Sequence, residues 1–265
     1  MNSQVLDLHF NDTEDFSFNE AIKTLRTNLQ FSGSRVKKIL ITSVAPNDGK
    51  SIITMMLARA FAETGKKTVV IDADVRKSVL LNRYGVAGET VGLTQVLSGQ
   101  IRPEEAVYQT TIPNLDLVLS GPYSPTPTEL FEDVMCANFF HYLSEQGYDM
   151  VIIDTPPLGT VIDAAILARY SDGIALVAAS EDTSKRALQR VKEQIDRTGV
   201  RFLGVILNKV RMDKGSYYSS YYHGYGTYGY GYGYGYEHGN ESGSEEGSGD
   251  RGKAGRWGKV KMPKK

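Results

Sequence analysis

The sequence has one cysteine, no long apolar run and no excess of charge of either sign. Cys136 stands alone among 265 residues, which excludes an internal disulfide framework and leaves this residue the role of a small apolar side chain. No stretch of about 18 uncharged apolar residues occurs, and the N-terminus lacks the basic start and apolar run of a signal peptide. With 30 basic and 31 acidic residues, nothing points to nucleic acid as a partner. We therefore expect a cytoplasmic protein that reaches a membrane only through a partner.

The composition divides the chain into one domain and one tail. Residues 1–212 are enough for a domain with a complete core, whereas residues 213–265 are of low complexity. Within this tail, residues 215–239 hold ten of the sixteen tyrosines, spaced mostly by glycine. Glycine has no side chain to bury and loses the most backbone entropy on folding, so the tail is predicted to be disordered. An acidic stretch at 237–250 and a basic stretch at 251–265 follow the tyrosines.

Six short β-branched runs predict strands, and helical periodicity separates most of them, for example at 51–64 and 183–198. Strands that are apolar along their whole length and alternate with helices predict an α/β fold with a mostly parallel sheet flanked by helices. Functional sites in such folds lie at the carboxyl ends of the strands. The six predicted strands are 37–44, 67–74, 114–121, 149–156, 173–180 and 201–208.

The first predicted strand runs into "SVAPNDGKSIIT", residues 43–54, which has the pattern of a phosphate-binding loop. In such a loop, backbone N–H groups at a helix N-terminus face a phosphate, a lysine clamps it, and a hydroxyl binds Mg²⁺. Lys50 and Ser51 fill these last two places, although Val44 stands where the first glycine of the motif belongs. The alternative is a plain polar loop before a helix. The predicted nucleotide-binding residues here are Asn47, Asp48, Gly49, Lys50, Ser51 and Ile52.

The second predicted strand ends in "VVIDADVRK", which puts Asp72, Asp74 and Arg76 at alternate positions. If the strand continues, all three side chains project on one side. Two carboxylates beside one phosphate site need a cation, which suggests Mg²⁺, and one of them could accept the proton of an attacking hydroxyl. The choice between Asp72 and Asp74 as this base stays open, and Arg76 is expected at the nucleotide. A solvated Asp/Arg turn is the alternative.

Two further strand ends complete the predicted site. "VIIDTPP" places Asp154 where it can orient Mg²⁺ or its waters opposite the phosphate loop. Asn208 ends the last strand, where it is either a base-contacting amide or a simple strand terminator. Together these strand ends predict a site for a nucleoside triphosphate. Its predicted catalytic residues are Lys50, Asp72, Asp74 and Asp154, and its predicted Mg²⁺ ligands are Ser51, Asp72, Asp74 and Asp154.

With these motifs, the chain resembles the cytoplasmic bacterial tyrosine kinases (BY-kinases) of capsule and exopolysaccharide biosynthesis. "APNDGKS" resembles their Walker A motif, "VVIDADVRK" their A′ motif and "VIIDTPP" their Walker B motif. The segments 20–31 and 120–131 also look like family segments, so the resemblance covers about residues 16 to 212 and then the tyrosine cluster. It implies a P-loop NTPase fold, ATP and Mg²⁺ as cofactors, and a protein-tyrosine kinase that regulates polysaccharide synthesis and export.

The resemblance also implies partners. The kinase would form a ring-like homo-oligomer and phosphorylate the tails of its neighbours, and phosphate charge on the tails could then dissociate the ring. A separate membrane protein would activate it and recruit it to the inner face of the membrane, and a tyrosine phosphatase would reverse the modification. The predicted acceptors are Tyr217, Tyr218, Tyr221, Tyr222, Tyr225, Tyr228, Tyr230, Tyr232, Tyr234 and Tyr236.

A helix is predicted over residues 17–31, with one apolar stripe that docks on the domain. This stripe consists of Phe18, Ile22, Leu25 and Leu29. Glu20, Lys23 and Arg26 lie off the stripe, toward solvent or a neighbour, and the resemblance implies that they bridge subunits, with Lys23 where the family has arginine. The alternative is a capping box, in which Glu20 reaches back to Ser17.

Two other functions fit parts of the sequence. A P-loop switch ATPase of the partition or division-site type shares the fold, but its deviant Walker A motif carries a lysine where this chain has Ala45. A non-catalytic scaffold would use the tyrosine tail for assembly, because aromatic and glycine repeats self-associate. Replacing Lys50 would not affect such a scaffold.

Overall fold

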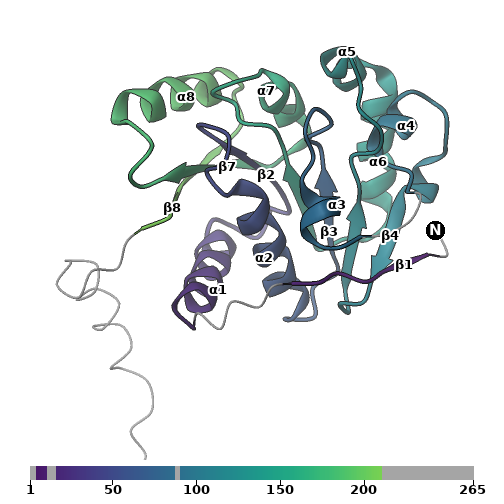
Figure 1. Ribbon diagram of the computed structural model, residues 1–265, viewed down its shortest axis with the longest axis horizontal. Helices are drawn as coiled ribbons and strands as arrows, with labels where there is room; N and C mark the ends of the chain where they lie inside the picture. The colour runs from purple at the N-terminus through teal and green to yellow at the C-terminus, as the bar shows by residue number, and fades with distance from the viewer. Residues whose placement is uncertain (1–3, 11–15, 87–89, 211–265) are drawn as a thin grey trace, which may run out of the picture. The chain divides into compact units, whose positions relative to one another are not determined.

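A computed structural model describes residues 4–10, 16–86 and 90–210, and these form an eight-stranded sheet with helices on both faces (Figure 1). The strand order is β1-β4-β5-β3-β6-β2-β7-β8. The described residues belong to the first of two units into which the chain divides, Met1–Arg211. The predicted tail at 213–265, with its ten candidate acceptors, lies outside the described residues.

The strands are β1 (Val5–Leu6), β2 (Lys38–Ser43), β3 (Thr68–Asp72), β4 (Val107–Thr110), β5 (Leu115–Val118), β6 (Met150–Asp154), β7 (Gly173–Ala179) and β8 (Phe202–Asn208). The α-helices are α1 (Phe16–Phe31), α2 (Lys50–Ala62), α3 (Leu80–Arg83), α4 (Leu93–Leu97), α5 (Pro127–Glu132), α6 (Val134–Glu145), α7 (Asp163–Leu167) and α8 (Lys185–Arg197). Two 3-10 turns, Pro103–Glu105 and Ala168–Tyr170, complete the described elements.

The predicted mostly parallel sheet is confirmed, and so are all six predicted strands. Every pairing in it is parallel except that of β4 with β5, which is antiparallel. Strands β1 and β4, which have two and four residues, were not predicted. Runs this short carry little periodicity, so they gave no usable signal.

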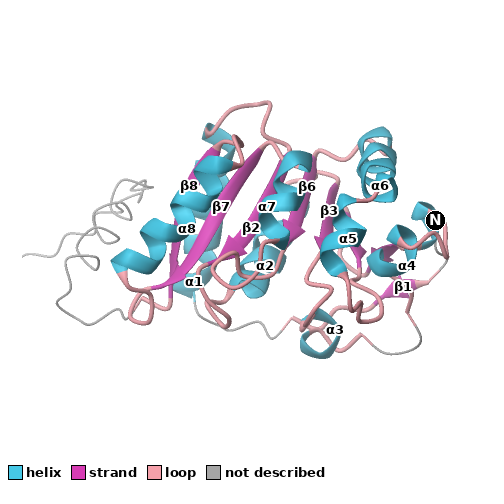
Figure 2. Cartoon of the chain, turned by 90° about the horizontal axis from the view of Figure 1, so that it is seen from above, coloured by secondary structure: helices cyan, strands magenta, loops and turns pink. Residues whose placement is uncertain are grey.

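Successive side chains of a strand point to opposite faces of the sheet, so each strand contributes to two separate cores. In β2, Ile39 and Ile41 pack into one core with α1, α2 and α3, whereas Leu40 packs into the other. The second core lies under α4 to α8, so the sheet is the middle layer of three (Figure 2). Strands buried on both faces read as the continuous apolar runs seen in the sequence.

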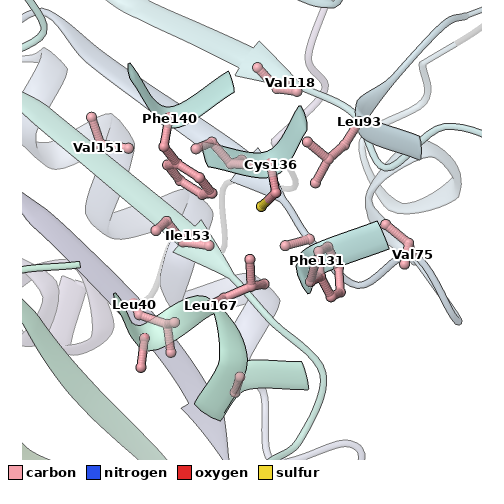
Figure 3. Close-up of a cluster of buried hydrophobic side chains, with 14 of the residues drawn as sticks. Leu40, Val75, Leu93, Val118, Phe131, Cys136, Phe140, Val151, Ile153 and Leu167 are labelled. Carbon is pink, nitrogen blue, oxygen red and sulfur yellow. The ribbon is translucent and has the colours of Figure 1, made fainter. Parts of the chain in front are cut away.

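Cys136 lies in the second core, among Phe131, Phe140 and Leu167 (Figure 3). Burial raises the pKa of its thiol to about 12, so it stays a neutral, unreactive side chain. The prediction that this cysteine is a small apolar residue is confirmed.

Helix α1 docks on α2 through its apolar stripe, as predicted, with Ile22 and Leu29 buried. Arg26 departs from the expectation that it faces solvent or a neighbour. Its Nη1 donates to the carbonyl of Ala60 in α2 at 2.9 Å, because the long side chain reaches across the helix contact. Glu20 and Lys23 instead form an exposed ion pair of 2.7 Å. Ser17 lies inside α1 rather than at its N-cap.

None of the helices among the described residues is both long enough and apolar enough to cross a membrane.

Candidate active site

The site forms where β2, β3 and β6 end side by side in the middle of the sheet. In parallel strands the carboxyl ends share one edge, so the residues that follow them come together. The register places Asp72 of β3 directly beside Asp154 of β6, and Asp154 beside Ile41 of β2. The predicted Walker A, A′ and Walker B segments therefore share one edge of the sheet.

The loop from β2 into α2 has the backbone of a phosphate-binding turn. Asn47 and Gly49 adopt positive φ values of 67° and 94°, and Gly49 immediately precedes the first residue of α2. The buried carboxylate of Asp48 accepts the N–H of Ala45 at 2.8 Å and closes the turn. Half-buried Ile52 lies in the first turn of α2, where the leading N–H groups of a helix have no acceptor within the helix and point out of its N-terminus, here toward this loop.

Asn208 braces this loop from the end of β8. Its Nδ2 donates to the carbonyl of Asp48 at 2.8 Å. A Cβ on Gly49 would lie 2.2 Å from the same Nδ2 atom, so glycine is required both for its φ and for this close approach. Asn208 is the last residue of β8, in agreement with the strand-terminator reading of the sequence, and it also supports the loop. A contact of its amide with a base stays a prediction.

The Lys50 ammonium lies among the predicted acidic residues. Its Nζ is 3.1 Å from Ser51 Oγ, 3.2 Å from Asp74 Oδ2 and 3.6 Å from Asp154 Oδ1. Burial alone would lower the pKa of Lys50, but the charges of Asp154 and Asp74 outweigh this effect and raise it. Lys50 therefore stays protonated and can neutralise carboxylates or a phosphate.

Asp72 and Asp154 are almost fully buried, with 1 % of each residue exposed. Burial and the neighbouring charge of Asp154 raise the pKa of Asp72 to about 7. Burial likewise raises the pKa of Asp154, although Lys50 opposes this effect. Ser78 donates its hydroxyl to Asp72 Oδ2.

Strand β3 ends at Asp72, so Asp74 and Arg76 do not continue its alternation. Asp74 instead lies in a loop folded around carboxylates. Its N–H donates to Asp72 Oδ1 at 3.2 Å, and its own Oδ1 accepts the N–H of Lys77 at 3.1 Å. The loop still brings Asp74 to Lys50, by a route different from the predicted one.

Arg76 is not directed to the phosphate loop. Its guanidinium binds both carboxylate oxygens of Asp163 in α7, at 2.6 and 2.9 Å, and it approaches Thr128 of α5 at 3.4 Å. The expectation that Arg76 contacts the nucleotide stays a prediction. The sequence predicted that Arg76 continues the strand, and this prediction gave no indication that Asp163 would be its partner.

The carboxylates suit a Mg²⁺ ion that is completed by phosphate and water. The Oδ2 atom of Asp154 is buried and has no hydrogen-bond partner among the described residues. No group of three His, Cys, Asp or Glu side chains in the described ranges could hold a metal by itself. Mg²⁺ is typically held by one or two carboxylates together with substrate phosphates, and Ser51 and Asp154 offer such a partial set.

The sequence analysis missed two residues in and near the site. Thr54 is buried in α2, and its hydroxyl lies 3.5 Å from Asp154 Oδ1. Asp163 is fully buried, and its only signal in the sequence is an acidic residue within the otherwise apolar run "VIDAAIL".

Known proteins that resemble this chain have the same kind of nucleotide-binding domain. Residues 36–202 match a family model described as an AAA domain, which defines the chain as a P-loop ATPase domain that binds nucleotide. Tyrosine-protein kinase CpsD of Streptococcus pneumoniae serotype 4 is 40 % identical over 198 residues, 75 % of this chain and 87 % of that protein.

Solved structures agree with the sequence relatives. The chimerical protein CapA2B2 superimposes with a TM-score of 0.72 at 32 % identity, over 78 % of this chain and 94 % of that one. The kinase domain of the Escherichia coli tyrosine kinase ETK gives 0.71 at 28 % identity, over 84 % of this chain and 83 % of that one. This chain belongs to the BY-kinase family of P-loop tyrosine-protein kinases.

Proposed function

We propose that this kinase transfers the γ-phosphoryl group of ATP to tyrosines 217–236 of its own tail, and that the tail of one subunit is the substrate of the next. The observation that carries the proposal is the convergence of Lys50, Asp74 and Asp154 at the carboxyl edge of the sheet. A chain with ten tyrosines that begin nine residues after β8 keeps phenols at high effective concentration near such a site.

The phosphate loop and its lysine would hold ATP. The N–H groups at the start of α2 and the Lys50 ammonium supply positive charge to the phosphates. Ser51 and Asp154 would hold Mg²⁺, with Asp72 and Asp74 close by; the ion would neutralise charge that develops on the phosphate oxygens. Asn208 keeps the loop in shape through its bond to Asp48.

In the transfer, the phenolic oxygen of a tyrosine forms a bond to the γ-phosphorus as the bond to the β-phosphate oxygen breaks, which leaves ADP. The phenolic proton passes to a carboxylate, since a tyrosine with a pKa near about 10 is a weak nucleophile at neutral pH. Asp74 suits this role better than Asp72, because 8 % of Asp74 is exposed against 1 % of Asp72. The hydrogen bond from the backbone N–H of Asp74 to Asp72 Oδ1 orients Asp74 as the base.

The proposal includes partners and a cellular role. Glu20 and Lys23 are exposed on α1 and can bridge to a neighbouring subunit in a ring, whereas Arg26 first serves the contact with α2. A membrane protein would supply a cytoplasmic segment that activates the kinase and recruits it to the inner face of the membrane, and a tyrosine phosphatase would reset the tail. Through this cycle the kinase would regulate capsule or exopolysaccharide synthesis and export.

Each phosphorylated tyrosine adds about 1.5 to 2 negative charges beside an acidic stretch. Repulsion among these tails would then release them from the sites and loosen the ring. The oligomer would thus act as a switch that phosphorylation opens and dephosphorylation resets.

A mixing experiment tests transfer between subunits. One copy carries Lys50→Met, intact tyrosines and a heavy isotope; the other keeps Lys50 but has all ten tail tyrosines replaced by phenylalanine. Phosphate on the heavy chain after incubation with Mg·ATP supports the proposal. Phosphate on wild type alone, and none in the mixture, would mean transfer within one chain. ATP hydrolysis without phosphotyrosine in any sample would favour the switch ATPase.

A further inference from the structure

The pair formed by Arg76 and Asp163 joins the loop after β3, residues 73–78 (the A′ loop), to the start of α7. Both guanidinium nitrogens that face Asp163 are engaged, Nε at 2.6 Å and Nη2 at 2.9 Å, so the contact is bidentate and fixes the plane of both groups. Nη2 also lies 3.4 Å from the hydroxyl of Thr128 in α5. The arginine therefore joins the A′ loop to two helices.

The burial of Asp163 shows that this pair is not an ordinary surface contact. Asp163 is fully buried, while 35 % of the Arg76 side chain is exposed. A buried carboxylate is costly unless a partner compensates its charge, and replacing such a pair with apolar side chains is often neutral for stability. The stability of the fold alone therefore does not explain why Arg76 and Asp163 form this buried ion pair.

The segment that precedes Asp163 is fixed to the end of β2 and to the start of the phosphate loop. The N–H of Leu158 donates to Thr42 Oγ1 at 3.0 Å, and Gly159 packs so closely that a Cβ would lie 2.0 Å from the carbonyl oxygen of Val44. Asp163 follows this turn at the start of α7. Because it is tied to the phosphate loop, Asp163 can hold Arg76 at a set distance from Lys50.

Two residues before Arg76 stands Asp74, whose Oδ2 contacts Lys50 Nζ at 3.2 Å. The loop between them is short. The N–H of Asp74 donates to Asp72 and the N–H of Lys77 to Asp74, and just before Asp74 the N–H of Ala73 donates to the carbonyl of Asp154 at 2.8 Å, so Arg76 is the anchor of the distal end of this loop. An external tether at Arg76 limits how far this loop can rotate as a unit. Loosening the tether would move the Asp74 carboxylate relative to Lys50.

We propose that Asp163 is a positioning residue: by clamping Arg76 it holds the A′ loop so that the Asp74 carboxylate stays beside Lys50 for phosphoryl transfer. The inference rests on the proposed function of this site. Asp163 itself touches neither nucleotide nor tyrosine in this role. It acts through Arg76, and its loss should lower turnover rather than the affinity for ATP.

The test uses the full chain in three variants. Asp163→Asn keeps the shape and removes the charge, and Arg76→Met combined with Asp163→Leu replaces the pair with apolar side chains. Leu143→Ala, in the core at the far end of α6, is the control for loss of stability without a change near the site. Each protein is measured for tyrosine phosphorylation at varied ATP, for Tm and for amide hydrogen exchange.

We expect Asp163→Asn to lower kcat about tenfold with KM for ATP within about twofold, since an interaction that acts only in the transition state is weakened. Amide exchange should accelerate at residues 73–78 and stay unchanged in β7. Asp163→Asn leaves Arg76 without its partner and should lower the Tm. The double variant should restore the Tm to that of wild type but keep the low kcat. An unchanged kcat in Asp163→Asn, an equal loss of kcat in Leu143→Ala, or recovery of kcat in the double variant would each overturn the proposal.

Hydrogen exchange separates this inference from the proposed function. If wild type transfers no phosphate to tyrosine, the proposed function fails. Exchange at 73–78 still tests the tether: acceleration in Asp163→Asn but not in Leu143→Ala supports it, and equal exchange in both overturns it.

Discussion

Asp72 and Asp154 are register partners at the ends of β3 and β6, which places two buried carboxylates side by side, with the Lys50 ammonium 3.6 Å from Asp154. Two buried carboxylates on adjacent strands can both persist only if a cation or a proton compensates their charge. Lys50 supplies part of that compensation, and the raised pKa of Asp72 supplies another part. The Lys50 ammonium and a proton held at Asp72 therefore balance the charge of these two carboxylates.

The first prediction concerns Lys50. Replacing it with methionine removes the positive charge beside three acidic side chains, which under the proposed function also binds the phosphates, so we expect tyrosine phosphorylation to fall by more than about a hundredfold. Steady-state labelling with Mg·ATP measures this loss. Lys192→Met, on the exposed face of α8, is the matched control and should keep full activity. Comparable activity in the Lys50 and Lys192 variants would contradict the role given to Lys50.

The second prediction follows from the pKa of Asp72, which burial and Asp154 raise to about 7. An unfolded aspartate has a pKa of about 3.9, so the folded state binds the proton more tightly. The stability that this group contributes is complete below about pH 4 and is lost as the pH rises to about 7. Asp72→Asn removes that loss.

Thermal denaturation without nucleotide, from pH 4.5 to 8, tests this dependence. The free energy of unfolding of Asp72→Asn relative to that of wild type, and with it the Tm, should rise with pH up to about 7 and then level off, by about 3 kcal/mol in total. Asp196→Asn, which removes an exposed partner of Lys192, should change stability by less than about 0.5 kcal/mol at any pH. A Tm difference for Asp72→Asn that does not vary with pH would refute the prediction.

The third prediction tests the brace on the phosphate loop. Gly49→Ala meets both a φ of +94° and the Asn208 amide at 2.2 Å, so we expect a loss of about 2 to 3 kcal/mol in the free energy of unfolding. Gly65→Ala has a φ of +80° with nothing within 4 Å, and so isolates the backbone strain of about 1 kcal/mol.

A double-mutant cycle completes this test. Asn208→Ala removes the clash, so the loss for Gly49→Ala in that background should approach that of Gly65→Ala. Chemical denaturation gives all four values. Strict additivity of Gly49→Ala and Asn208→Ala would mean that the close approach has no energetic weight.

The fourth prediction concerns α1. Arg26→Ala loses the bond to the Ala60 carbonyl and should cost about 1 to 2 kcal/mol, whereas Lys23→Ala loses an exposed pair and should cost less than about 0.5 kcal/mol. Sedimentation velocity on the same variants reports on assembly. If Glu20 and Lys23 bridge subunits, Lys23→Ala should lower the oligomer mass without lowering the Tm, and an unchanged mass would remove Lys23 from the interface.

The sequence predicted the part of the site that depends on local order. Strand, turn and helix follow one another along the chain around Lys50, and the apolar runs before Asp72 and Asp154 mark strands, so these residues could be placed at one edge of the sheet. Contacts between residues far apart in the sequence could not be predicted from it. Asn208 meets Asp48 over 160 positions and Arg76 meets Asp163 over 87, and no local pattern encodes such distances.

The antiparallel β4 and the end of β3 at Asp72 were missed for a related reason. Val107–Thr110 is too short to show a period, and hydrogen bonds from Asp74 and Ser78 to Asp72, rather than any breaker residue, accompany the end of β3. Tertiary contacts override local propensity at such places.

The most direct measurement is mass spectrometry of the full chain after incubation with Mg·ATP, wild type beside Lys50→Met, with and without the cytoplasmic segment of a membrane activator. The account predicts phosphate on tyrosines 217–236 of the wild type and none on the variant. Phosphate at the same tyrosines in both proteins, or steady ATP hydrolysis by the wild type with no phosphotyrosine, would contradict it.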